Sequence, residues 1–236
     1  MNDRGLISEE VSATKRKPKL EEPRSQTRYQ KIGGALLFVA GVIIYMGIIT
    51  AEALYPAAYN TAQNEISDLG ATRPPDSVIL QPSATIFDVT MIVTGLMIIG
   101  GAYCVHRVFK RGAVTVPLAL LGIGALGVGI FPGNHAVMHP IFAMLTFIAG
   151  GLAAILAYKV EAQPMRYISV ALGGIALLTL LLAIFLGEAG LIGVLGDGGT
   201  ERWVAYPVVL WLVGFGGYLL GLSPQRQTQP RWTDRP

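Results

Sequence analysis

Eight polar side chains in four short segments are of the types that move protons, bind phosphate or ligate metal ions. The segments read NEISDLG, IFD, FPGNHAVMHP and ER. Carboxylates and imidazoles serve as general acids and bases, and a guanidinium fits a phosphate bidentately. The candidate catalytic residues are Asp68, Asp88, His135 and His139, and the candidate binding residues are Asn64, Ser67, Glu201 and Arg202.

The two histidines are also candidate metal ligands. His135 and His139 are four residues apart, which places them on one face if they share a helix. A metal site also needs a third protein ligand, and Pro140 favours a helix that starts at or after the proline. Metal ligation, metal-free acid–base or phosphate contact, and structural hydrogen bonding therefore stay open. No nucleotide-binding or catalytic signature names a cofactor.

Each of the other candidates also has a structural interpretation. Asp88 follows Phe87 near the start of an apolar segment, where a helix N-terminus favours a carboxylate; ionisable residues within a membrane are otherwise functional by default. Arg202 either clamps a phosphate, extends to lipid headgroups or pairs with Glu201. Thr200 and Glu201 have the pattern of a helix N-terminal cap.

The elements that carry these residues must lie in a membrane. Of 236 residues, 52% are hydrophobic and only 14% are charged, against about 25% charged in soluble domains. The chain is thus no ordinary soluble enzyme, and with a single cysteine it is no disulfide scaffold. An all-α bundle of six transmembrane helices is predicted, since six apolar segments are long enough to cross a bilayer. They are Ile32–Leu54, Thr85–Val105, Ala113–Phe131, Met138–Tyr158, Tyr167–Gly187 and Trp203–Leu222.

Charge sets the expected orientation. All but two of the 18 Lys and Arg residues lie in the termini or in the second and fourth connections, and the exceptions are Arg73 and Arg202. The positive-inside rule then places both termini in the cytoplasm of a multi-pass cell-membrane protein. We expect a disordered basic tail over 1–31, a transmembrane domain over 32–222 and a short tail over 223–236. Because the basic residues adjoin apolar segments, membrane lipids and not nucleic acid are the expected partners; protein partners stay unknown.

The first outer loop, Tyr55–Ala84, is long enough to suggest function. Its ISDLG string predicts a turn in which Ser67 or Asp68 accepts backbone N–H groups and Gly70 takes positive φ. Three prolines follow. We expect this loop to fold over the outer mouth of the bundle, and the outer candidates to converge there into one cluster.

Several of these strings together resemble a known membrane family. NEISDLG at 64–70, IFD at 86–88, the stretch 130–139 and Glu201-Arg202 are similar to the multi-helix family catalogued as domain of unknown function 998. The string ISDLGATRPPDS also resembles the damage-regulated autophagy modulator (DRAM-like) family. The resemblance implies a six-helix membrane protein whose outer loops carry its motifs, and no settled reaction.

Three functions fit the sequence. The first is a protein that handles lipid or a phosphate-bearing headgroup at an outward-facing polar site, for instance as an intramembrane hydrolase or transferase. The second is a scaffold or assembly factor whose polar motifs only fold the outer loops. The third is a proton-coupled transporter that uses Asp88.

Overall fold

The computed structural model describes residues 22–222, which fold into helices and loops without a β-strand. Six of its helices are long and apolar enough to cross a membrane, so the predicted multi-pass all-α architecture is confirmed. These helices are α1 (Glu22–Ala53), α2 (Ser83–Phe109), α3 (Gly112–Ile130), α4 (Met138–Leu156), α5 (Met165–Leu186) and α6 (Leu191–Gly221). The short 3-10 helices are η1 (Ile66–Leu69), η2 (Ala157–Lys159) and η3 (Gly187–Ala189).

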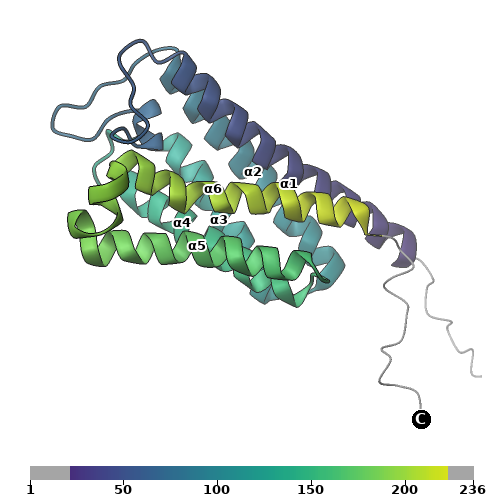
Figure 1. The fold of residues 1–236 in the computed structure, drawn as a ribbon. Coiled ribbons are helices and arrows are strands. Elements are labelled where there is room, and N and C mark those ends of the chain that lie inside the picture. Colours follow the sequence, from purple (N-terminus) through teal and green to yellow (C-terminus); the bar gives the residue numbers. More distant parts are fainter. Residues whose placement is uncertain (1–21, 223–236) are drawn as a thin grey trace, which may run out of the picture.

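The six helices form a closed ring. Each helix packs against the next one along the chain, and α6 packs against α1, while α4 and α6 contact each other only weakly. Glycines allow the close approaches: a Cβ on Gly216 of α6 would lie 2.4 Å from the backbone nitrogen of Phe38 in α1. The start of α1 and the end of α6 lie at one end of the bundle, the termini end, and the α1–α2 connection lies at the other, the loop end (Figure 1).

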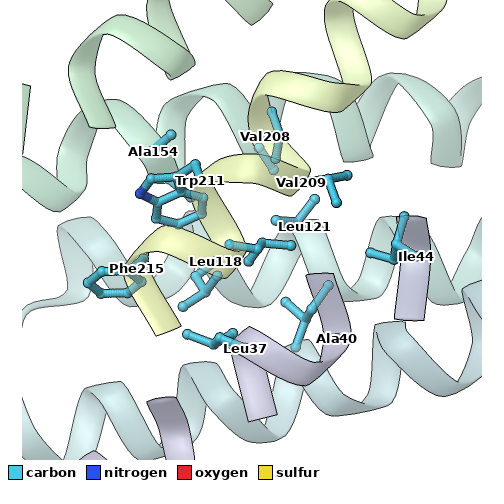
Figure 2. Close-up of a cluster of buried hydrophobic side chains, with 14 of the residues drawn as sticks. Leu37, Ala40, Ile44, Leu118, Leu121, Ala154, Val208, Val209, Trp211 and Phe215 are labelled. Carbon is cyan, nitrogen blue, oxygen red and sulfur yellow. The ribbon is translucent and has the colours of Figure 1, made fainter. Parts of the chain in front are cut away.

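Apolar side chains fill the centre of the ring towards the termini end. The aromatic rings of Trp211 and Phe215 stack with centroids 5.3 Å apart, and both side chains are fully buried. Figure 2 shows them among side chains from four helices, which include Leu37, Ala40, Ile44, Leu118, Leu121, Ala154, Val208 and Val209. This core joins α6 to α1, α3 and α4 through side chains at the centre of the ring.

Two boundaries differ from those expected. Residues 22–31, which we assigned to a disordered tail, belong to α1; residues 1–21 and 223–236 lie outside the described range. At the other boundary α6 begins at Leu191 and not at Trp203, where the last apolar segment was expected to start. Gly196 breaks this helix with φ 74°, and Thr200 is consequently no N-terminal cap, because its hydroxyl donates to the Gly196 carbonyl within the helix at 2.7 Å.

Candidate functional site

The α1–α2 connection folds over the loop end of the bundle, as expected. Three apolar residues of the connection, Ile66, Leu69 and Ala71, are buried. The N–H of Gly198 in α6 donates to the carbonyl of Ala62 at 3.0 Å. A Cβ on Gly198 would lie 2.0 Å from the Asn64 carbonyl oxygen. The connection is therefore a packed part of the fold, held against the first turns of α6.

Arg202 fastens this connection. Its Nη1 donates to the carbonyl oxygens of Thr61 and Asn64, each at 2.9 Å, and to that of Gly198 at 2.8 Å. Its Nη2 donates to Glu52 Oε1 at 2.6 Å and to the Tyr59 hydroxyl at 2.8 Å. Both terminal nitrogens of the guanidinium are thus already occupied by protein acceptors, and the side chain is only 11% exposed. Arg202 therefore does not form the phosphate clamp that the sequence allowed, because its terminal nitrogens bind protein oxygens instead.

The NEISDLG segment forms η1 and its cap. Asp68 Oδ2 accepts the N–H of Glu65 at 2.9 Å, which closes a capping box. The expected turn role of Asp68 is thus confirmed. Gly70, in contrast, has φ −83° and not a positive value. It is glycine because a Cβ there would lie 2.7 Å from Asp88 Oδ1.

The carboxyl groups of Glu65 and Glu201 flank this turn. Glu201 Oε2 accepts the N–H of Ile66, which joins α6 to η1. Glu65 pairs with Arg73 at 2.5 Å, but the Arg73 side chain is 68% exposed, so this pair contributes little to stability. Burial raises the pKa of Glu65 by more than the Arg73 guanidinium lowers it.

The two histidines occupy different environments. His139 is buried at the start of α4, and its Nδ1 bonds the carbonyl oxygen of Phe131 at 2.9 Å. His135 is exposed, and its ring meets the Phe131 ring edge-on. Helix α4 begins at Met138, before Pro140, because a proline in the first turn loses no hydrogen bond. Within residues 22–222 no group of three His, Cys, Asp or Glu side chains could hold a metal ion, so the histidine pair lacks a third ligand.

Asp88 and Asn64 line neither of the two cavities at the loop end. Asp88 is half-buried in α2, and its Oδ1 is enclosed without a hydrogen-bond partner in the described chain. Asn64 has a structural role: its Oδ1 accepts the N–H of Asn60 at 2.9 Å, and its carbonyl accepts from Arg202.

Two adjoining cavities open at the loop end. The outer one, the cleft, has a volume of about 350 Å³ and is lined by residues of the α1–α2 connection, the α3–α4 connection, α4, α5 and α6. The inner one, the pocket, has a volume of about 80 Å³ and lies inside the ring among apolar side chains such as Leu121, Val208 and Leu212. Five residues line both cavities and are called the collar: Ser67, His139, Ala143, Phe147 and Glu201.

The candidate residues therefore separate into three groups. Ser67, His139 and Glu201 meet in the collar. Asn64, Asp68 and Arg202 fold the loop, and Asp88 and His135 line neither cavity. The side chains that accept hydrogen bonds from Arg202 were not predicted, because Glu52 and Tyr59 lie far from Arg202 in the sequence and no local pattern links them to it.

A buried carboxyl group at the termini end was missed as well. Glu161, in the α4–α5 connection, is 2% exposed. Its Oε1 accepts the Ser169 hydroxyl at 2.8 Å, and its Oε2 has no partner among the described residues. Burial raises the pKa of Glu161 to about 7, although the hydrogen bond from Ser169 favours the charged form. A lone Glu in a short basic connection carries no pattern that predicts burial.

Comparison with known proteins places most of the bundle in one family. Residues 38–218 match the family model described as protein of unknown function (DUF998). The comparisons with curated proteins and with solved structures return no match. The local DRAM-like similarity gains no support from them.

Proposed function

The chain belongs to the DUF998 family, and from this premise we propose that it binds a lipid-like amphiphile at the loop end of the bundle. One observation carries the proposal: a cleft that contains the charged residues Glu65, Arg73 and Asp197 adjoins an apolar pocket through the collar. An amphiphile has the same division, with a polar head and an apolar chain. Ligand sites in helical bundles are commonly apolar cavities with a few placed polar groups.

The pocket suits a hydrocarbon chain. Its volume of about 80 Å³ exceeds the roughly 10–15 Å³ that one water needs. The walls are mainly Ile, Leu, Val, Met and Phe side chains of α1, α2, α3 and α6. Such walls offer water few partners, whereas an apolar cavity readily takes up an apolar ligand.

The charge of the cleft selects the head. The cleft is lined by three carboxyl groups, those of Glu65, Asp197 and Glu201. Its one guanidinium, that of Arg73, already pairs with Glu65. The lining residues of the cleft therefore include no unpaired guanidinium or ammonium that could bind an anionic head. The geometry therefore favours a neutral or cationic head over the phosphate monoester that Arg202 first suggested.

The test uses purified protein in nanodiscs and three amphiphiles with the same chain: hexadecyltrimethylammonium, hexadecylglycerol and hexadecyl phosphate. Ala143→Leu places extra carbons in the collar, and Ala171→Leu makes the same change on an exposed face of α5. We expect the first two probes to bind better than the phosphate, and Ala143→Leu to weaken binding about ten-fold, equivalent to ~1.4 kcal/mol. Ala171→Leu should leave binding unchanged.

Two results would reject the proposal. Equal binding by wild type and Ala143→Leu would mean that the cavities are not the site, and the scaffold alternative would then stand. Preferential binding of hexadecyl phosphate would refute the argument from cleft charge. The transporter alternative has less support, because Asp88 lines neither cavity.

The orientation belongs to the proposal too. The distribution of Lys and Arg supports cytoplasmic termini in a cell membrane. The cleft would then open on the outer side.

A further inference from the structure

The collar contains an imidazole with a defined free nitrogen. His139 Nδ1 bonds the Phe131 carbonyl oxygen at 2.9 Å. A carbonyl only accepts, so Nδ1 carries the proton and the neutral ring has its lone pair on Nε2. Nε2 forms no hydrogen bond within residues 22–222, and it is not among the side-chain atoms enclosed without a partner. A basic nitrogen is therefore available where the ring lines the two cavities.

The other two polar side chains of the collar, Glu201 and Ser67, can form further hydrogen bonds. Glu201 binds the Ile66 N–H through Oε2, and no hydrogen bond to Oε1 is formed by the described residues. The Ser67 hydroxyl has only a long contact of 3.5 Å to Glu65. The collar thus contains the basic Nε2 of His139, the Oε1 carboxyl oxygen of Glu201 and the weakly bonded hydroxyl of Ser67.

The position of the collar, between the cleft and the pocket, determines which bond of a bound amphiphile lies beside these groups. In an acylated amphiphile the ester lies between the polar head and the hydrocarbon chain. With the head in the cleft and the chain in the pocket, that ester lies at the collar. We propose that the collar is a hydrolytic centre for the acyl ester of a bound amphiphile, with His139 as the general base. This inference rests on the proposed function.

The reaction balances with water as the only co-reactant. His139 Nε2 takes a proton from a water molecule, and the water oxygen bonds to the ester carbonyl carbon. The Ser67 hydroxyl donates to the oxyanion that forms, while Glu201 Oε1 orients the water. The bond from carbon to the leaving oxygen then breaks, and the imidazolium returns its proton to that oxygen. The products are a fatty acid and the alcohol of the head.

The decisive variant is His139→Asn. An asparagine amide N–H can replace Nδ1–H and keep the bond to Phe131, but it has no basic nitrogen at Nε2. His135→Asn is the matched control, since His135 is exposed and lines neither cavity. The protein is placed in nanodiscs of ether-linked lipid, so that the bilayer itself is no substrate. The probes are monopalmitoylglycerol and palmitoylcholine, each with a labelled chain, and the uncleavable hexadecylglycerol.

We expect wild type and His135→Asn to release palmitate from one or both esters. His139→Asn should lose about 10²–10⁴-fold in rate with unchanged binding of hexadecylglycerol and an unchanged Tm. Binding of hexadecylglycerol without cleavage of either ester overturns the hydrolytic centre and leaves the binding function intact. Failure of hexadecylglycerol to bind overturns the binding function itself. Full activity of His139→Asn, or a loss of its binding or Tm, overturns the role of His139 as base.

Discussion

The stability of the protein should fall as pH rises, because of Glu161. Its carboxyl has a pKa of about 7 in the folded chain against an ordinary value of 4.5. Between these values the folded protein holds a proton that the unfolded chain has released, so rising pH favours unfolding. The change from 4.5 to about 7 in the pKa of Glu161 corresponds to about 3 kcal/mol of lost stability by pH 8.

Glu161→Gln isolates this effect. The amide oxygen of glutamine still accepts the Ser169 hydroxyl, but the side chain cannot ionise. At pH 8 the variant should be more stable than wild type by up to about 3 kcal/mol, and at pH 4 the two should agree. Unfolding in detergent micelles at both values measures the difference. Glu188→Gln, at an exposed position, serves as the control and should follow wild type. Wild-type stability that is constant or rises over this range, with the same course in Glu161→Gln, would refute the reasoning.

Three other expectations concern the loop end and the orientation. Arg202→Lys should destabilise the protein by about 3 kcal/mol, because a lysine ammonium cannot donate to five acceptors and leaves Glu52 poorly paired. An unchanged Tm would contradict the role of Arg202 in holding the α1–α2 connection. Gly198→Ala should lower the free energy of unfolding by about 1–3 kcal/mol and expose the α1–α2 connection to protease. Gly174→Ala should be tolerated, because nothing lies within 4 Å of its Cβ. Equal effects of the two variants would contradict the packing of Gly198 against the connection. Cysteines placed at Asp76 and Ala162 should react with impermeant reagent from outside and inside the cell respectively, and the reverse would sink the proposed topology.

The sequence predicted what depends on composition and local pattern. Six apolar segments predict six helices, because every backbone group in a bilayer must be bonded internally. The glycine-rich α3 with Pro117 was correctly assigned as a span, since glycines allow close helix contact. The capping role of Asp68 is also local, because it joins residues three apart.

Long-range partnerships could not be predicted. Arg202 bonds residues near 60 and Glu52, about 140–150 positions away, and no local pattern marks them. Its guanidinium has the same donors whether it meets a phosphate or five protein oxygens. Gly70 was misassigned because a tight contact with Asp88, and not a positive φ, requires glycine there. Only the fold could show that Ser67, His139 and Glu201 share a wall while His135 does not.

The most direct test of amphiphile binding is to map where the chain end of a bound probe lies. Hexadecyltrimethylammonium with a diazirine at the end of its chain is photolysed in nanodiscs with the protein, and the labelled residues are identified by mass spectrometry. We predict adducts on Leu121, Val208 and Leu212, inside the pocket, and their loss in Ala143→Leu. Adducts confined to bilayer-facing positions such as Leu178 and Ile184, which are 57% and 54% exposed, would contradict the account.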